Sequence, residues 1–283
     1  MNRQLYLECY SGISGDMTVA ALLDLGADEQ ILRKALASLP VGGFEIAVTR
    51  KVKSGLDVCD FDVILDAEHE NHDHDMEYLH GHDHQHTHDH EHVHEDGSVH
   101  THEHHHHDHS HEHHHDHGHH HEHRGLHEIL HIIEHADMTE RAKETAVRIF
   151  QILAEAESKA HGVPADQVHF HEVGAVDSIV DILAVAVCLD NLDITEVIVP
   201  FLCEGQGSIR CQHGIIPVPV PAVVNIAQAH GLTLKPTGVQ GELVTPTGAA
   251  IVAAVRTSDK LPQTCRIVKI GMGAGKREYE GTG

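Results

Sequence analysis

Hydrophobic and polar positions near the N-terminus predict one strand followed by two helices. Apolar and polar side chains alternate over residues 4–10, as they do in a half-buried strand. Apolar positions then recur at helical spacing over residues 17–25 and 27–40, and Gly26 and Pro40 are suited to end these helices. Further along, residues 43–52 and 56–67 alternate with period two on either side of a turn-forming Lys-Ser-Gly, which favours a β-hairpin.

After residue 123 helical segments and short strands follow one another. The longest helical segment has clear ends, because Thr139 is suited to cap its start and Gly162 to end it. A Gly- and Pro-rich stretch over 201–221 predicts a loop. In chain order the pattern predicts helices over 125–136, 139–161 and 177–192, a strand over 196–200, that loop, a helix over 221–230, a strand over 232–236 and a helix over 249–257.

This alternation favours an α/β fold in which a mixed sheet is flanked by helices. The 283 residues suffice for one large or two smaller cores. Residues 69–123 contain hardly any side chain that could support a core, so we expect a long disordered His-rich insertion there. The predicted organisation is a first part of the core over 1–68, the insertion over 69–123, a second part over 124–270 and a Gly-rich tail over 271–283.

The insertion holds 27 of the 35 histidines and predicts metal binding. Neutral imidazole is a ligand for Ni, Cu, Zn and Co, and many histidines on a mobile chain satisfy several coordination geometries. The irregular spacing favours storage or delivery over catalysis, and a solvated segment with incidental metal affinity is the alternative. The densest part contributes the candidate ligands His102, His104, His105, His106, His107, His113, His114, His115, His119, His120 and His121.

The formal net charge of −25 comes largely from this insertion. Residues 69–123 contain 14 acidic residues and no Lys or Arg, and the 30 acidic residues elsewhere exceed the 19 Lys and Arg by 11. An acidic balance without a basic patch disfavours nucleic acid and anionic membrane as partners. The six cysteines form no CxxC pair, and residues 1–10 show no signal-peptide pattern, so we expect a cytoplasmic protein.

The stretch HFHEVGAVDSIVD, residues 169–181, is the strongest candidate for a metal site inside the fold. In a strand His169 and His171 point to one face, and Asp177 and Asp181 lie four apart on one face of the following helix. With Glu172 these side chains can converge at the junction between strand and helix. Mixed nitrogen and oxygen ligands suit Ni, Zn or Mn without choosing between them.

The helix that carries Asp181 is apolar nearly all round, which predicts that it is buried. A buried carboxylate is costly unless it has a cation, a hydrogen-bond donor or a shifted pKa. The alternative is that Asp177 caps the helix, Glu172 is solvated and the histidines are ordinary core residues.

Two segments are candidates for binding an anion at a helix N-terminus. SGISGDM offers Ser11, Ser14 and Asp16 in a turn before a helix, and Thr245 and Thr247 begin another. Ordinary helix capping explains both segments equally well.

Two other motifs are weak. GMGAGK fails as a phosphate-binding Walker motif, because Ile270 stands where a glycine is required and Arg277 where Ser or Thr is required. His127, His131 and His135 share one helix face, which suits a metal or an ordinary polar surface.

Five segments occur in an order that resembles the LarC family, the nickel insertion proteins for the nickel-pincer nucleotide cofactor. They are SGISGDM, HFHEVGAVDSIVDI, HGIIPVPVPA, ELVTPTGAAI and GMGAG, and a His-rich insertion at this position is also similar to that family. The resemblance implies a cytoplasmic, CTP-dependent cyclometallase, a nickel chelatase that inserts Ni²⁺ into pyridinium-3,5-bisthiocarboxylic acid mononucleotide. CTP is used there with Mn²⁺ or Mg²⁺, and the product serves lactate racemase and related acceptor enzymes.

Family members continue beyond GMGAG into a second domain associated with CTP and metal, so this chain resembles their N-terminal portion, and a homo-oligomer is one alternative for its assembly. On this resemblance Asp177, Asp181 and Glu172 are the catalytic candidates, which hold nickel with His169 and His171. Ser11, Ser14, Asp16, His213, Thr245 and Thr247 are the candidates for holding the phosphate-bearing precursor. The alternatives are a non-enzymatic nickel metallochaperone or store, and a metal-dependent hydrolase.

Overall fold

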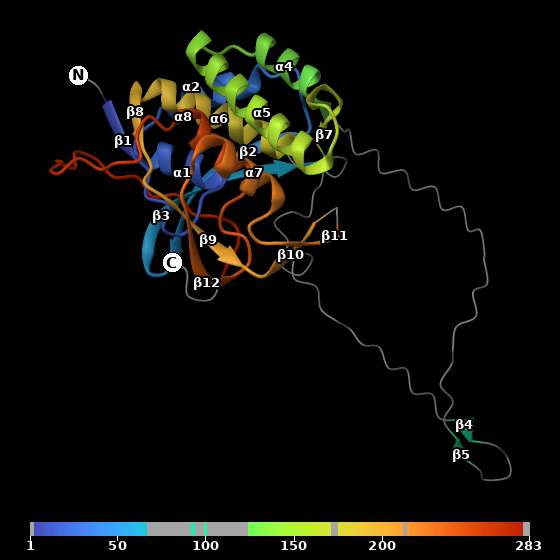
Figure 1. The fold of residues 1–283 in the computed structure, drawn as a ribbon. Coiled ribbons are helices and arrows are strands. Elements are labelled where there is room, and N and C mark those ends of the chain that lie inside the picture. The colour runs from blue at the N-terminus through green and yellow to red at the C-terminus, as the bar shows by residue number, and fades with distance from the viewer. Residues whose placement is uncertain are drawn as a thin grey trace.

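The fold is given by a computed structural model that describes residues 3–66, 92–93, 99–100, 124–170, 175–211 and 214–279 (Figure 1). Its helices agree closely with the helical spacing of apolar positions. They are α1 (Gly15–Asp24), α2 (Glu29–Ala37), α4 (Leu126–His135), α5 (Glu140–His161), the 3₁₀ turn η1 (Ala165–Gln167), α6 (Val176–Asn191), α7 (Pro221–His230) and α8 (Pro246–Val255).

The strands are β1 (Arg3–Tyr6), β2 (Phe44–Lys53), β3 (Leu56–Leu65), β4 (His92–Val93), β5 (Val99–His100), β6 (Arg124–Gly125), β7 (His169–Phe170), β8 (Ile194–Ile198), β9 (Leu202–Gln206), β10 (Ser208–Cys211), β11 (Gly214–Pro217) and β12 (Leu234–Gln240). β1 pairs with β8 and β12 with β9 in parallel, whereas β2–β3, β4–β5, β6–β7 and β10–β11 are antiparallel. The predicted α/β class is therefore confirmed, but the strands form two-stranded sheets instead of one mixed sheet. A single parallel bridge, Cys9 to Leu202, links the chain after β1 to β9.

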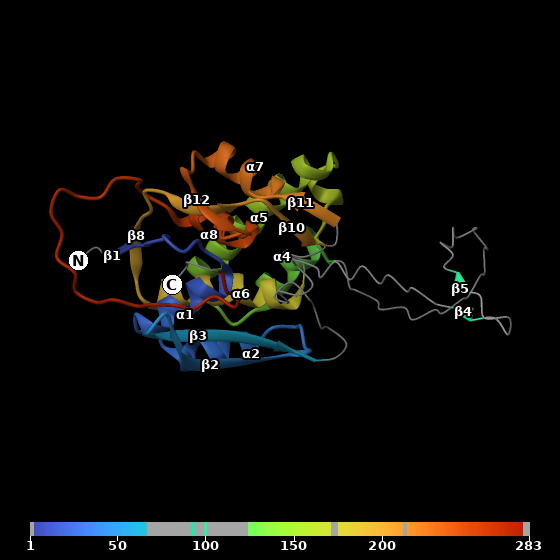
Figure 2. The same ribbon diagram turned by 90° about the horizontal axis from the view of Figure 1, so that it is seen from below.

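A helical layer lies between the β2–β3 hairpin on one side and β9, β12 and α7 on the other (Figure 2). β3 packs against α1 and α6, and α5 packs against α6, α7 and α8. The core draws side chains from both sides of the histidine tract, since Leu22 and Phe61 belong to the same hydrophobic cluster as Phe150 and Leu183. Residues before and after the tract thus build one core.

The observed helix ends match the predicted signals. The Thr139 side chain accepts a hydrogen bond from the Ala142 N–H, and Gly162 takes a left-handed conformation (φ 68°) after α5. α6 is buried on most of its surface, as its apolar composition predicts. Its N-cap is Ala175, so Asp177 does not cap α6 but lies in its first turn.

The prediction of a loop over 201–221 is wrong, because this stretch contains β9, β10 and β11. One of its glycines, Gly205, allows close packing of the backbone. A Cβ at Gly205 would overlap the Gly241 carbonyl oxygen of the chain after β12. The Val218–Pro219 peptide bond is cis, next to the start of α7. The turn-forming composition therefore concealed β9, whose partner β12 lies further along the chain, and the short local hairpin β10–β11.

The tail segment, residues 271–279, lies between β3 and α1. Its backbone pairs with β3, since the Cys59 N–H donates to the Met272 oxygen (3.0 Å) and the Ala274 N–H donates to the Cys59 oxygen (2.8 Å). On its other side it touches α1, where a Cβ at Gly273 would overlap the Met17 carbonyl oxygen. The alternating glycines of GMGAG therefore let this segment lie between a strand and a helix.

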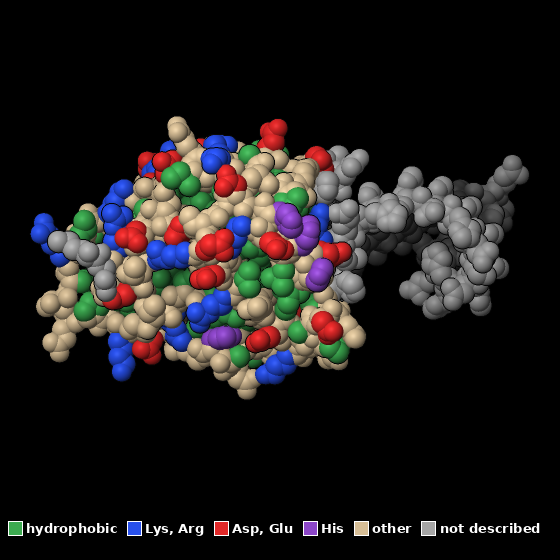
Figure 3. Space-filling model, turned by 90° about the horizontal axis from the view of Figure 1, so that it is seen from above, with side chains coloured by type: hydrophobic (Ala, Val, Ile, Leu, Met, Phe, Trp, Pro, Cys, Tyr) green, Lys and Arg blue, Asp and Glu red, His purple; other side chains and the backbone are tan. Residues whose placement is uncertain are grey.

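Acidic and basic side chains are interspersed over the face shown in Figure 3. None of the helices in the described ranges is long and apolar enough to cross a membrane. The predicted disordered insertion over 69–123 lies outside the described residues, apart from β4 and β5.

Candidate functional site

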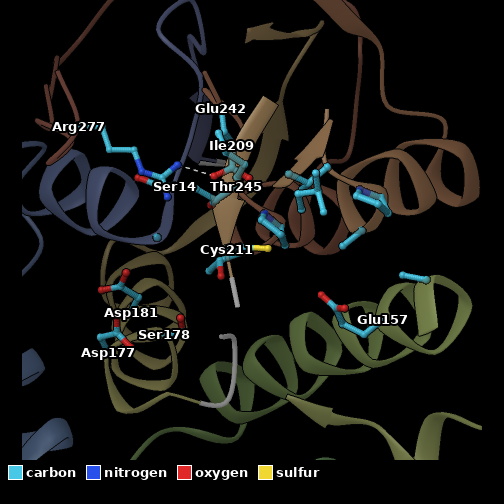
Figure 4. Close-up of a pocket in the computed structure, with 18 of the residues that line it drawn as sticks. Ser14, Glu157, Asp177, Ser178, Asp181, Ile209, Cys211, Glu242, Thr245 and Arg277 are labelled. Atoms are coloured by element: carbon cyan, nitrogen blue, oxygen red, sulfur yellow. Dashed lines mark hydrogen bonds and ion pairs between the residues drawn. The ribbon is translucent and has the colours of Figure 1, made fainter. Parts of the chain in front are cut away.

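A cavity of about 340 Å³ opens where the starts of four helices meet. Its wall comes from the starts of α1, α6, α7 and α8, the end of α5, the β10–β11 hairpin, Glu242 and the tail segment (Figure 4). Helix N-termini carry positive partial charge and unsatisfied N–H groups, so this convergence suits anionic groups.

The cavity unites candidate residues that the sequence placed in separate sites. Asp177 and Asp181 line it from α6, and Ser14 and Asp16 line it from α1. Thr245 and Thr247 line it from the start of α8. Ser11 is not among the lining residues, although it belongs to the same segment as Ser14.

Asp181 is a buried carboxyl group of the site. Burial, and then the neighbouring Asp16 and Asp177, raise its pKa well above the usual range, while Lys276 and the Asp16 backbone N–H act in the opposite direction. Its Oδ1 is buried and accepts no hydrogen bond from the described part of the chain. The side chain lies directly on α1, because a Cβ at Gly15 would meet Asp181 Oδ2 at 2.5 Å. The expectation that a buried Asp181 requires a donor or a shifted pKa agrees with this environment.

The two anion-site candidates are packed against each other through glycine. The Ile13 N–H donates to the Leu243 oxygen (2.9 Å) and the Thr245 N–H donates to the Ile13 oxygen (3.1 Å). A Cβ at Gly12 would overlap the Leu243 oxygen, and one at Gly248 would overlap the Ile13 oxygen. SGISGDM and ELVTPTG therefore form one unit that fixes the starts of α1 and α8 beside the cavity.

The hydroxyl groups of this unit differ in what they do. Thr245 Oγ1 accepts from the Gly248 N–H (3.1 Å), so Thr245 caps α8 as the ordinary explanation predicts. Ser14 is the N-cap residue of α1 but makes no side-chain cap, and its Oγ donates to Asp16 Oδ1. Thr247 is largely buried on the cavity wall.

Several cavity residues were missed by the sequence analysis. Arg277 of the tail segment lines the cavity and forms an ion pair with Glu242, and both side chains are largely buried. Opposite them, Glu157 and His161 of α5 line the cavity with Glu157 Oε2 and His161 Nε2 3.3 Å apart. Burial raises the pKa of Glu157, and His161 opposes that shift. The basic pair that ends GMGAGKR was the available signal for Arg277.

Glu204 on β9 does not line the cavity but binds the chain that leads into its wall. Its Oε1 accepts from the N–H groups of Gly205 (2.7 Å), Leu243 (2.8 Å) and Val244 (3.2 Å). Burial raises its pKa to about 7, and the three N–H donors oppose that shift. Glu204 therefore holds the segment that leads into Thr245.

The proposed nickel ligands are only partly described. No group of three or more His, Cys, Asp or Glu side chains within the described ranges could hold a metal ion. The His169 backbone lies in β7, but its side chain, His171, Glu172, His213 and the eleven tract histidines lie outside the described residues. His127, His131 and His135 are exposed on α4, and the His131 and His135 rings lie 4.2 Å apart.

The sequence is similar to that of known proteins over nearly its whole length. The profile of a family described as "Nickel insertion protein" matches residues 5–282. "Pyridinium-3,5-bisthiocarboxylic acid mononucleotide nickel insertion protein" is the name of relatives from Alkaliphilus metalliredigens (50% identity over 98% of this chain and 58% of the relative), Geobacillus kaustophilus (38%, 97% and 56%) and Acetivibrio thermocellus (36%, 98% and 57%). The chain thus spans little more than half the length of these relatives. No solved structure matches it.

Proposed function

The chain belongs to the nickel insertion protein family, and from this premise we propose that it inserts nickel into pyridinium-3,5-bisthiocarboxylic acid mononucleotide at the cavity. The observation that carries the proposal is the position of Asp16, Asp177 and Asp181 on one cavity beside two further helix N-termini. Within the described part of the chain these carboxylates do not hold a metal ion by themselves. Together with His169, His171 and Glu172 they would bind a divalent cation, and the helix starts suit an anionic substrate.

The carboxylates serve nickel and the proton. Forming a nickel–carbon bond replaces a ring C–H bond, so one proton has to leave for each such bond. Burial raises the pKa of Asp181 in the protein without metal. A cavity carboxylate that is not bound to nickel during this step would accept the proton as a general base. Asp177 and Asp181 would hold nickel with His169, His171 and Glu172, and the positive ion would relieve the repulsion between neighbouring carboxylates.

The substrate is held from the opposite side. Ser14, Thr245 and Thr247 line the cavity and are the hydroxyl groups that we assign to the precursor, with His213 as a further candidate. Asp16 lies with the carboxylates and would act toward the cation instead of the phosphate. Ser11 would act only through the loop that it shares with Ser14.

We further propose that the histidine tract supplies nickel to this cavity in the cytoplasm. CTP with Mn²⁺ or Mg²⁺ would support the reaction together with the part of the relatives that this chain does not span. A lactate racemase-type enzyme would accept the product, and the protein would work as a homo-oligomer.

The test is a mass-spectrometric assay for the nickelated product. The protein is mixed with Ni²⁺, the mononucleotide, CTP and Mn²⁺, with and without the remaining part of a relative supplied separately. Asp181→Asn should lower the insertion rate about 100-fold or more, the usual range for losing a general base. Asp193→Asn is the matched control, because Asp193 follows α6 with a left-handed backbone (φ 53°) that suits Asn equally.

If Asp181→Asn and Asp193→Asn inserted nickel at the same rate as the unchanged protein, the cavity would not be the insertion site. Turnover of a phosphate ester without a nickelated product would instead indicate a hydrolase.

A further inference from the structure

Two consecutive basic residues of the tail segment point to different places. Lys276 Nζ lies 3.3 Å from Asp60 Oδ1 and 3.0 Å from Asp62 Oδ1, so it neutralises carboxylates of β3. Arg277 lines the cavity, where its Nη1 pairs with Glu242 Oε2 and its side chain is 16% exposed. The backbone pairing of the tail segment with β3 fixes both positions.

The Arg277 guanidinium is held in place by its neighbours. Glu242 and Tyr279 both stabilise its charged form and raise its pKa, against the opposing effect of burial. The Tyr279 hydroxyl donates to the Glu242 carbonyl oxygen (3.0 Å), which ties the segment before α8 to the tail segment. A planar guanidinium fixed in this way is pre-organised for the oxygens of a carboxylate or a phosphate.

Charge is distributed unevenly around the cavity. Figure 4 shows Asp177 and Asp181 together on α6, whereas Arg277, Glu242, Ser14 and Thr245 lie on another side. A doubly negative phosphate is repelled by the α6 carboxylates, whereas on the other side Arg277 balances Glu242 and the start of α8 attracts an anion. The side with Arg277 is therefore the more favourable one for an anion.

We infer that Arg277 and the start of α8 at Thr245 and Thr247 form a phosphate subsite, which takes the phosphate monoester of the mononucleotide. Glu242 stays paired with Arg277 Nη1, and the phosphate accepts from other N–H groups of the same guanidinium. This inference rests on the proposed function and extends it, because a phosphate held at Arg277 directs the pyridinium end toward Asp177 and Asp181.

Calorimetric titration of four probes tests the subsite. The probes are the mononucleotide, the same compound after removal of its phosphate, CTP and inorganic phosphate. Arg277→Gln should weaken mononucleotide binding about 10- to 100-fold, the value of a charge-assisted hydrogen bond, and change binding of the dephosphorylated compound less than about twofold. Inorganic phosphate should compete with the mononucleotide in the unchanged protein and lose this effect in Arg277→Gln.

Three further variants keep the test decisive. Arg256→Gln is the matched control, because Arg256 donates to the His230 and Gly231 oxygens and does not line the cavity. Arg277→Lys should give an intermediate loss, since a lysine keeps the charge without the fork. If Arg277→Gln fails to fold with Glu242 left unpaired, the double variant Arg277→Gln with Glu242→Gln removes both charges and should show the same selective loss.

Each remaining outcome overturns something specific. Equal weakening of the mononucleotide and its dephosphorylated form, or no weakening of either, overturns the phosphate subsite alone. A loss for CTP but not for the mononucleotide overturns the assignment to the monoester. If the unchanged protein binds neither form of the precursor, the proposed function fails, and the subsite fails with it.

Discussion

Asp181 and Glu204 are both carboxyl groups withdrawn from water, yet their surroundings suit different tasks. Glu204 Oε1 accepts three backbone N–H groups, which fixes the group in one orientation. Each of the two carboxyl groups has one buried oxygen without a hydrogen bond from the described residues, but Asp181 also lies beside two other carboxylates at the cavity. The first arrangement stabilises a segment of chain, and the second stores an unfavourable charge that a cation would relieve.

Glu204 predicts a specific dependence of stability on pH. Its pKa is about 7 in the folded protein and near the usual 4.5 in the unfolded chain, so between these values the folded state holds more protons. The free energy of unfolding therefore falls as the pH rises through this window. Glu204→Gln keeps an acceptor for the N–H groups without titrating, so between about pH 5 and pH 8 it should gain up to about 3 kcal/mol relative to the unchanged protein.

Urea denaturation of both proteins with a chelator, at both pH values, measures this difference. Glu45→Gln is the control, because Glu45 is an exposed carboxyl group on β2. A constant difference in unfolding free energy between Glu204→Gln and the unchanged protein across the window would show that Glu204 does not titrate there.

Sequence reasoning reached Asp181 but not Glu204, for a physical reason. The burial of Asp181 can be predicted from its own helix, because that helix is apolar nearly all round. Two of the three partners of Glu204 are backbone N–H groups 39 and 40 residues further along the chain. A backbone donor leaves no trace in the sequence pattern.

At the scale of elements, helices and the β2–β3 hairpin were predictable because their signals are local. The 201–221 region was not, since β9 pairs with the distant β12 and the glycines and prolines of the region hid the local β10–β11 hairpin. The tail segment likewise has its partners in β3 and α1, far away in sequence. Glycines that allow close packing and glycines that form loops have the same appearance in a sequence.

Two glycines of the tail segment make a matched pair for testing its packing. A Cβ at Gly273 would overlap backbone atoms of α1, including the Met17 oxygen, whereas one at Gly275 would meet the Met17 Sδ at 2.9 Å. Backbone cannot move aside as a flexible methionine side chain can. We expect Gly273→Ala to destabilise the protein by about 1–3 kcal/mol, the usual cost of overpacking, and Gly275→Ala by less than about 1 kcal/mol.

Thermal unfolding followed by circular dichroism measures both variants, and a loss of about 2–10 °C is expected for Gly273→Ala. Gly273→Ala should also weaken mononucleotide binding, because the position of Arg277 depends on the position of the tail segment. Equal melting temperatures for the two variants would contradict the packing of the tail segment against α1.

At the scale of the whole molecule, the cavity is assembled from segments at both ends of the sequence. Ser14 and Asp16 come from the first helix, and Arg277 comes from the last described residues. The separate motifs could be recognised from the sequence, but their meeting at one cavity could not, because it depends on how α1, α6 and α8 pack. The histidine tract, the most conspicuous feature of the sequence, lies outside the described residues apart from β4 and β5.

The tract lies in the sequence between two segments that build one core, and this leads to a prediction about nickel supply. The core is built from residues on both sides of 69–123, so a variant lacking that segment should keep its fold. A tethered metal-binding chain raises the local nickel concentration near the cavity without adding a contact there. Deletion should therefore slow nickel insertion about tenfold or more when free nickel is buffered to a low level, as expected from a loss of effective concentration, and have little effect at saturating nickel.

A variant with the tract histidines changed to serine controls for the length of the segment and should behave like the deletion. A nickel store would instead lose its function at every nickel concentration, so measuring the insertion rate against free nickel distinguishes supply from storage.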